Sequence, residues 1–171
     1  MALIFVTSND GKFEEVKKIL SGYGIDLQQE ELDLTEIQGN MEEIAAYKVR
    51  EAFRILNKPV MVDDMSLCFD ALGGFPGPYI KPFMDHVEVK DFVQILEKLG
   101  DCNATAIATV AYCSGQDPVI FQGQVRGQIV EPRGISSLKG DSIFIPENEN
   151  VTYAEMGKEK VNRVSPRQIA L

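Results

Sequence analysis

The stretch ALIFVTSNDGK (residues 2–12) decides how the fold begins, because an apolar segment runs through a polar turn into a helical pattern. Ala2–Val6 predicts a buried strand. Apolar residues then recur at helical spacing, at Phe13, Val16, Ile19 and Leu20. A strand, a tight turn and a helix leave free backbone N–H groups at the helix start, where an anion can bind. Lys12 is unfavourable there unless an anion is present, because the helix N-terminus is itself partly positive.

The turn between strand and helix admits two interpretations. It consists of Thr7, Ser8, Asn9, Asp10, Gly11 and Lys12. In the first interpretation its hydroxyl and amide groups and Lys12 contact an anion, and Gly11 lets the backbone approach it. In the second, Asn9 or Asp10 caps the helix and Lys12 is a surface residue. The glycine spacing is not that of a Walker A loop.

Length and composition predict one globular domain over residues 1–171. Apolar residues make up 44% of the chain and charged residues 25%, and no apolar run is long enough to span a membrane. The net charge of −9 disfavours nucleic-acid binding. It does not exclude a small polyanion, which needs only local lysines and a divalent cation held by carboxylates. Three cysteines without metal-type spacing predict reduced thiols and a cytoplasmic location.

Strand and helix patterns alternate early in the chain, and strands dominate later. The expected strands are residues 2–6, 26–34, 60–62, 104–114 and 118–130, and the expected helices contain residues 13–20, 41–56 and 89–99. The last two strands are expected to pair around the turn Gly115–Pro118, and residues 71–83, rich in glycine and proline, are expected to be irregular. This order predicts an α/β fold with a mixed central sheet.

Lys48 lies inside the apolar stripe of the second predicted helix rather than opposite it. A lysine there either reaches out to solvent or meets an anion. Asn40 and Glu43 fit a capping box, which gives Glu43 a structural role. Glu36 precedes the helix in a loop, where its carboxylate points either at a metal ion or at water.

Asp63 and Asp64 follow the apolar run Val60–Val62. Two acids at the end of a buried strand are costly unless they are solvated, paired or bound to a cation. The ends of sheet strands are also where α/β proteins place ligands, and carboxylate oxygens suit Mg²⁺. The alternative is an exposed turn. Together with the turn, the two lysines and Glu36, the acids predict metal-assisted attack on a phosphate chain.

These segments resemble, in order, the motifs of the inosine triphosphate pyrophosphatase family. TSNDGK (7–12) is similar to the family's T-x-N-x-x-K turn, and EIQG (36–39) with Glu43, Ile44 and Lys48 is similar to its second block. VDDMSLCFDALGGFPGPYIK (62–81) resembles its acidic strand end and long loop. Further matches are Phe121, Gly123, GQI (127–129), PRG (132–134) and TYAEM (152–156). The resemblance spans nearly the whole chain.

The family hydrolyses non-canonical purine nucleoside triphosphates to the monophosphate and pyrophosphate, and the resemblance implies that reaction here. The implied substrate-binding residues are Thr7, Ser8, Asn9, Asp10, Gly11, Lys12, Lys48, Asp141, Lys160 and Arg167. Glu36, Asp64 and Asp63 would hold Mg²⁺. Asp64, Glu36 and Lys12 would be catalytic, with Asp64 helping to activate the attacking water. The implied fold is an elongated, mixed-sheet α/β fold with a central substrate cleft, and the implied assembly is a homodimer.

The half of the site that reads the base departs from the family pattern. Gly140 stands beside Asp141 where the family has a base-stacking aromatic residue. In the family motif S-H-R a histidine and an arginine address the purine; here it reads Ser165-Pro166-Arg167, so Arg167 is retained while Pro166 replaces the histidine and offers no hydrogen-bond donor. The family also has a lysine shortly before this S-H-R motif. When the sequences are compared without gaps, Val161 occupies the position of that lysine, and Lys160 is adjacent. Loss of one base stack costs about 1–3 kcal/mol, so we expect altered or relaxed base specificity.

An alternative is a non-catalytic protein that keeps the fold to bind a nucleotide or a partner. The set Glu36, Lys48 and Asp64 argues against it, because a scaffold has no physical need for such a costly cluster. Measurable binding without turnover would favour this alternative.

Overall fold

The computed structural model describes residues 2–115, 117–136 and 138–171. They divide into two compact units. The first comprises Met1–Asp64, Ala108–Gly123 and Arg167–Leu171, and the second comprises Met65–Ile107 and Gln124–Pro166. Gln116, in the predicted turn, lies outside the described residues. The prediction of a single domain over residues 1–171 stays a prediction.

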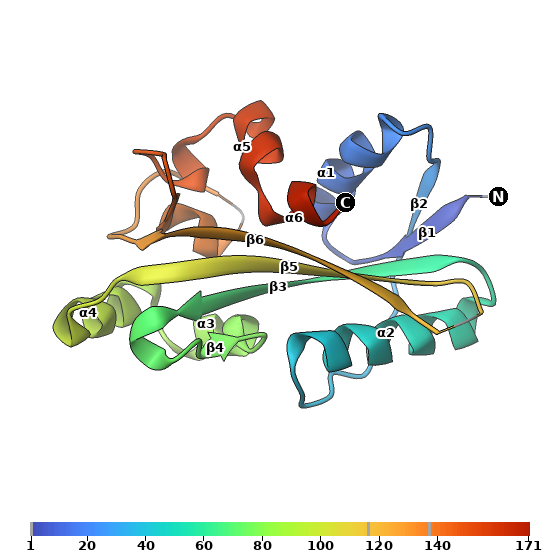
Figure 1. The fold of residues 1–171 in the computed structure, drawn as a ribbon, viewed down its shortest axis with the longest axis horizontal. Coiled ribbons are helices and arrows are strands. Elements are labelled where there is room, and N and C mark those ends of the chain that lie inside the picture. Colours follow the sequence, from blue (N-terminus) through green and yellow to red (C-terminus); the bar gives the residue numbers. More distant parts are fainter. Residues whose placement is uncertain (1, 116, 137) are drawn as a thin grey trace. The chain divides into compact units, whose positions relative to one another are not determined.

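The first unit begins with strands and helices in alternation (Figure 1). Its elements are β1 (Leu3–Val6), α1 (Asp10–Ser21), β2 (Leu27–Glu30), α2 (Met41–Leu56), the start of β3 (Val60–Phe69), the end of β5 (Asn103–Cys113), the start of β6 (Val119–Ile129) and most of α6 (Pro166–Ala170). β1 pairs in parallel with both β2 and β3, with Leu3 opposite Leu27 and Ile4 opposite Val60.

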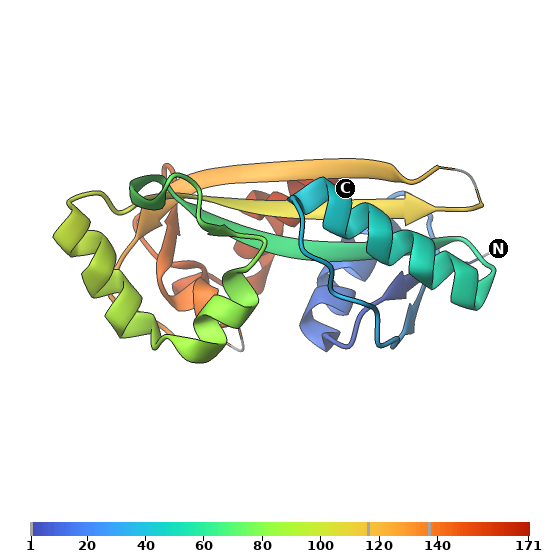
Figure 2. The ribbon, with the colours of Figure 1, turned by 90° about the horizontal axis from the view of Figure 1, so that it is seen from below.

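Helices α1 and α2 cover opposite faces of the strands of this unit (Figures 1 and 2). The reason is topological. Because β1 lies between β2 and β3, the two connections run in opposite directions, and right-handed crossovers then place their helices on opposite sides. One buried cluster joins α2 to the strands and contains Ile4, Val6, Ala45, Val49, Ala52, Val60, Val62, Ala111 and Cys113. The alternate strand residues Phe5 and Met61 are also buried, as a sheet covered on both faces requires.

The second unit has a core of its own. Its elements are the rest of β3, the 3₁₀ helix η1 (Asp70–Leu72), β4 (Pro76–Gly77), α3 (Ile80–His86), α4 (Val89–Leu99), the start of β5, the end of β6, η2 (Lys139–Ser142), β7 (Phe144–Pro146), η3 (Tyr153–Glu155) and α5 (Lys158–Val164). Aromatic rings stack in this core, Phe69 on Phe92 at 5.7 Å and Phe144 on Tyr153 at 5.5 Å between centroids.

The predicted mixed α/β class is confirmed. The strands of the described residues follow the order β2-β1-β3-β5-β6-β7, with β4 paired to β3. The pairs of β1 are parallel, whereas β3–β4 and β6–β7 are antiparallel. Among the described residues, no helix has both the length and the apolarity that crossing a membrane requires. The elongated shape and the central cleft stay predictions.

Two expectations about local structure are wrong. The strand expected over residues 60–62 runs from Val60 to Phe69, so Asp63 and Asp64 lie within it rather than at its end. Residues 71–83, expected to be irregular, include β4 and the start of α3. In both places long-range pairing or packing overrides the local signal of acids, glycine and proline.

We predict that Gly127→Ala destabilises the protein by about 1–3 kcal/mol, the usual cost of forcing atoms into a packed site. A Cβ at Gly127 would lie 2.2 Å from the Ile145 carbonyl oxygen and 2.6 Å from Phe144 Cζ. Gly140→Ala is the matched control, because its Cβ would make only an ordinary contact, 3.7 Å from Met84 Cε. Urea unfolding measures both variants, and equal midpoints would contradict the prediction.

Candidate active site

Most of the predicted site residues belong to the first unit. They are Thr7, Ser8, Asn9, Asp10, Gly11, Lys12, Glu36, Lys48, Asp63, Asp64 and Arg167. They come from the turn between β1 and α1, from the loop before α2, from α2 itself, from the first half of β3 and from α6. One compact unit therefore holds the predicted phosphate and metal ligands together with one residue predicted to address the base.

The turn between β1 and α1 is ordered by its own side chains. Asn9 caps α1, because its Oδ1 accepts from the Lys12 backbone N–H at 2.9 Å. The Asn9 N–H donates to Thr7 Oγ1 at 3.1 Å. Gln29 of β2 donates to the Thr7 carbonyl oxygen and to Asp10 Oδ1, at 3.1 and 3.2 Å. The capping interpretation of Asn9 is thus confirmed, and the turn is held from both sides.

The pleat of β3 separates the two adjacent acids. Successive side chains of a strand point to opposite faces. Asp63 accordingly points toward α1 and α6, whereas Asp64 points toward α2, as their ion-pair partners show. The interpretation of the two acids as an exposed turn is wrong, because each of them meets a cation inside the fold.

Asp63 is the centre of a buried ion cluster. Its side chain is 0% exposed. Lys12 Nζ lies 3.0 Å from Asp63 Oδ2 and donates to the Asp63 carbonyl oxygen at 3.1 Å. Arg167 donates to the same Oδ2 through Nε at 3.2 Å and Nη2 at 3.1 Å, and its Nη1 pairs with Glu15. Lys12 is therefore not the surface residue that the second interpretation of the turn expected.

These charges set the protonation of the cluster. Burial by itself would raise the pKa of Asp63, but the positive charges of Lys12 and Arg167 outweigh it and lower that pKa to about 2. Burial would likewise lower the pKa of Arg167, yet the carboxylates of Asp63 and Glu15 raise it. The opposite charges thus outweigh burial and keep Asp63 and Arg167 ionised at neutral pH.

Lys48 joins two carboxylates on the other face. Its Nζ lies 2.9 Å from Asp64 Oδ1 and 2.9 Å from Glu36 Oε1. The Lys48 side chain is only 10% exposed, so it meets anions rather than reaching out to solvent. Burial lowers the pKa of Lys48, but Asp64 and Glu36 more than offset this and raise it. Lys48 is thus a fixed positive charge.

The donor set around Lys48 suits a hard divalent cation. Asp64 Oδ2 is buried and has no hydrogen-bond partner, which leaves an acceptor for a ligand. The Glu36 side chain is 68% exposed and accessible from solvent. Mg²⁺ typically takes one or two carboxylates and completes its shell with water and phosphate oxygens. Glu36 and Asp64 fit that requirement.

The three predicted metal ligands do not form one cluster. Within residues 2–115, 117–136 and 138–171, no group of three or more His, Cys, Asp or Glu side chains is arranged to hold a metal ion. Asp63 is engaged by Lys12 and Arg167 on the opposite face of β3 from Asp64. The geometry therefore favours Glu36 and Asp64 as ligands without Asp63.

Two predicted substrate-binding residues belong to the second unit. Asp141 accepts a hydrogen bond from Ser136 Oγ at 2.7 Å, and Lys160 forms an ion pair with Glu149. Their contacts with a substrate stay predictions.

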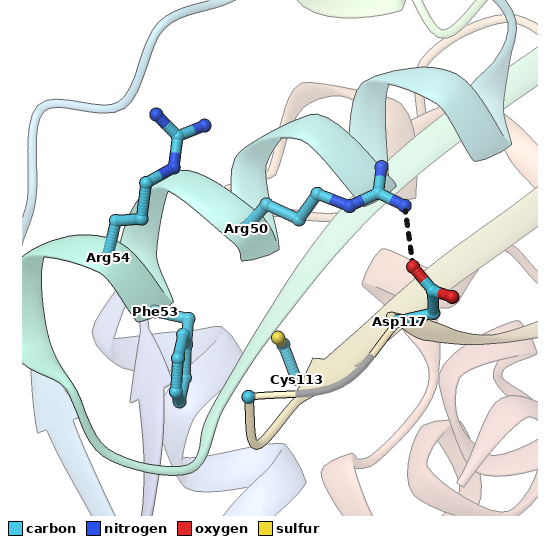
Figure 3. Close-up of a pocket in the computed structure, with 6 residues that line it drawn as sticks. Arg50, Phe53, Arg54, Cys113 and Asp117 are labelled. Carbon is cyan, nitrogen blue, oxygen red and sulfur yellow. Dashed lines mark ion pairs between the residues drawn. The ribbon is translucent and has the colours of Figure 1, made fainter.

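An open depression of about 670 Å³ lies elsewhere on the first unit (Figure 3). Its lining residues are Arg50, Phe53, Arg54, Cys113, Gly115 and Asp117. Arg50 Nη2 lies 3.6 Å from Asp117 Oδ1, and Figure 3 shows Arg54 pointing away from this pair. The depression contains no predicted site residue, and its two guanidinium groups do not converge.

Sequence reasoning missed Glu15 and Gln29. Glu15 follows Lys12 by three positions on α1, and this spacing places both residues on one helix face. That spacing was the available signal for Glu15. Gln29 contacts the turn only because β2 pairs with β1, so no local signal identifies it.

Known proteins resemble this chain over nearly its full length. A model of the Ham1 family matches residues 3–171. An inosine triphosphate pyrophosphatase from Tuber melanosporum is 46% identical, covering 99% of this chain and 92% of the relative. A dITP/XTP pyrophosphatase from Methanopyrus kandleri is 42% identical, covering 100% and 93%. The structure of the Staphylococcus aureus Ham1 protein superposes with a TM-score of 0.80 at 26% identity, covering 98% and 93%.

We predict that the ion cluster around Asp63 makes folding sensitive to acid. The pKa of Asp63 in the fold, about 2, lies below its usual 3.8. Its contribution to stability is therefore complete above about pH 4 and is lost as the pH falls toward 2. The difference in unfolding free energy between wild type and Asp63→Asn should shrink by about 1 kcal/mol from pH 6 to pH 3.

Chemical denaturation across this pH range measures the effect. Asp117→Asn is the control, because the Asp117 side chain is fully exposed and its difference from wild type should not follow this pattern. A pH-independent difference for Asp63→Asn would contradict the prediction.

Proposed function

The chain belongs to the Ham1 family, and on this premise we propose that it is a nucleoside triphosphate pyrophosphatase. It hydrolyses non-canonical purine nucleoside triphosphates to the monophosphate and pyrophosphate. The relatives named inosine triphosphate pyrophosphatase and dITP/XTP pyrophosphatase support this substrate class. The observation that carries the proposal is the buried Lys48 ammonium held between Asp64 and Glu36.

The triphosphate binds at the start of α1. The first turn of a helix leaves backbone N–H groups without intrahelical acceptors, and its partial positive charge attracts phosphate. Lys12 and Lys48 add two full charges from the same unit. The hydrogen bonds among Thr7, Asn9 and Lys12 hold the turn in place before a ligand arrives, which lowers the entropic cost of binding.

Glu36 and Asp64 hold Mg²⁺. The buried, unpartnered Asp64 Oδ2 and the exposed Glu36 carboxylate support this pair. When bound, Mg²⁺ supplies charge neutralisation on the phosphate oxygens and lowers the pKa of a bound water. Asp63 is left out of the ligand set, because it lies on the other face of β3, where its Oδ2 accepts from Arg167 and forms an ion pair with Lys12. Its Oδ1 is buried and, like Asp64 Oδ2, without a hydrogen-bond partner among the described residues, so the face of the strand decides between the two acids.

The chain's own side chains account for the rest of the reaction. Asp64 accepts the proton of the water that attacks the α-phosphorus. The bond from that phosphorus to the bridging oxygen breaks, and its electrons leave with pyrophosphate. Lys48 is protonated because its pKa is raised, so it stabilises the charge that develops on the phosphates. Lys12 adds a second positive charge, and Glu36 holds Lys48 in place.

The base half of the site supports altered or relaxed specificity. Among the described residues, a Cβ at Gly140 would lie within 4 Å only of Met84 Cε, at 3.7 Å, so no described aromatic side chain contacts this position in place of the family residue. Pro166 opens α6 and brings no donor. Arg167, which the resemblance assigns to the base, instead donates to Asp63 and pairs with Glu15.

The homodimer and the cytoplasmic location also belong to this proposal. Val119 and Phe121, alternate residues of β6, are 48% and 47% exposed and offer apolar surface for a second copy. No disulfide bond joins any of the cysteines Cys68, Cys102 and Cys113, all of which the structure describes, and this supports a reducing compartment. Light scattering at several protein concentrations tests the dimer, and a constant monomer mass would contradict it.

We predict that pyrophosphate is released with Mg²⁺ from a panel of inosine, xanthosine, guanosine, adenosine and pyrimidine triphosphates. Asp64→Asn should lower kcat at least about 100-fold, the usual effect of removing a general base. Asp117→Asn is the matched control and should leave kcat unchanged, because Asp117 is fully exposed and outside the proposed site. Chelation of the metal should abolish turnover.

The outcome of the panel separates the alternatives. Broad or shifted turnover supports the altered base pocket, whereas a wide preference for inosine and xanthosine triphosphates would contradict it. Nucleotide binding without any turnover that depends on Asp64 would favour the non-catalytic alternative.

A further inference from the structure

The cluster around Asp63 is more elaborate than a phosphate-binding lysine requires. It contains two cations, Lys12 and Arg167, and two anions, Asp63 and Glu15. Asp63 has no exposed side-chain surface, and Arg167 is only 4% exposed. Arginine is almost never buried without a partner, and here Asp63 and Glu15 are its partners. Four buried or nearly buried charges are costly to assemble, so their arrangement calls for a role.

Within this cluster Asp63 Oδ2 links Arg167 to Lys12. It accepts from Arg167 Nε and Nη2, and Lys12 Nζ lies 3.0 Å from the same oxygen. Lys12 Nζ also donates to the Asp63 carbonyl oxygen. An ammonium group has three N–H donors, so the hydrogen bond to the Asp63 carbonyl oxygen and the ion pair with Oδ2 do not use up its capacity. The Lys12 side chain is also 17% exposed, which leaves the ammonium accessible to a ligand.

We infer that Arg167 is a positioning residue for triphosphate binding, because it holds Asp63, which in turn fixes the Lys12 ammonium at the start of α1. This inference rests on the proposed function, which places the triphosphate at Lys12. Under this inference α6, through Arg167, helps to position the Lys12 ammonium that binds phosphate, in addition to any contact with the base.

The charges explain why the effect should reach the phosphates. With Arg167 present, the cluster of Lys12, Arg167, Asp63 and Glu15 is neutral. Without it the cluster carries one net negative charge beside the place where the triphosphate binds. Asp63 then also has no competing cation and holds Lys12 more strongly. Because both effects act on phosphate, they should be the same for every base.

The first experiment uses a probe that has no base. Calorimetry measures binding of inorganic triphosphate with Mg²⁺ to wild type, Arg167→Gln, Arg167→Lys and Arg163→Gln. Arg163 is exposed on α5 and is the matched control. We expect Arg167→Gln to weaken binding about tenfold, the effect of one partly buried charge. Arg167→Lys should restore part of the loss, and Arg163→Gln should match wild type.

A double-mutant cycle then tests whether Arg167 acts through Asp63. If it does, Arg167→Gln should weaken triphosphate binding clearly less than tenfold in an Asp63→Asn background, where only the loss of its charge remains, because contacting residues are not additive. An undiminished tenfold loss in that background would mean that Arg167 acts independently of Asp63 and would overturn the inference. Thermal unfolding checks that each variant is folded, and Arg167→Lys carries the test if Arg167→Gln is not.

Kinetics separates this inference from the proposed function. Arg167→Gln should lower kcat/KM by the same factor for inosine and guanosine triphosphates, mainly through a higher KM, so that the ratio between the two nucleotides stays as in wild type. Unaltered binding of inorganic triphosphate, with a change only in the ratio between nucleotides, would make Arg167 a base-reading residue and overturn the inference. If wild type hydrolyses no nucleotide while Arg167→Gln still weakens inorganic triphosphate binding, the proposed function fails and the inference stands.

Discussion

The pleat of β3 is the constraint on which the site depends. A strand sends neighbouring side chains to opposite faces, so Asp63 and Asp64 cannot share one ligand without breaking the strand. Asp63 is paired with Lys12 and Arg167, whereas Asp64 is paired with Lys48. Two adjacent carboxylates that look like a single acidic motif thereby become the centres of two separate ion clusters.

Each cluster also ties distant parts of the chain to β3. Lys48 comes from α2 and brings the loop residue Glu36 with it. Lys12 and Arg167 come from α1 and α6, at opposite ends of the sequence. Removing one partner of a buried ion pair leaves an uncompensated charge and typically costs about 3–5 kcal/mol. The same ion pairs therefore hold the helices in place and arrange the groups proposed to bind phosphate and metal.

The sequence predicts the parts of this arrangement that have a local signal. The strand, turn and helix of residues 2–20, the cap at Asn40 and the anomalous position of Lys48 in its apolar stripe can all be recognised without a structure, and the structure contains each of them. The extension of β3 beyond Asp64 cannot be predicted in this way. Two adjacent acidic residues usually indicate the end of a buried strand. Here β3 continues past them because cations from distant parts of the chain pair with both acids. The partners of Arg167 are hidden for the same reason, because Asp63 and Glu15 lie more than a hundred residues away.

We propose that Asp64 binds the metal and that Asp63 does not. Calorimetric titration of Mg²⁺ into wild type, Asp64→Asn and Asp63→Asn, each saturated with a non-hydrolysable inosine triphosphate analogue, tests this difference most directly. We expect Asp64→Asn to weaken metal binding at least about tenfold, as loss of a ligand does, and Asp63→Asn to stay within about threefold of wild type. Equal losses in the two variants would contradict it, because the two acids would then serve one metal site.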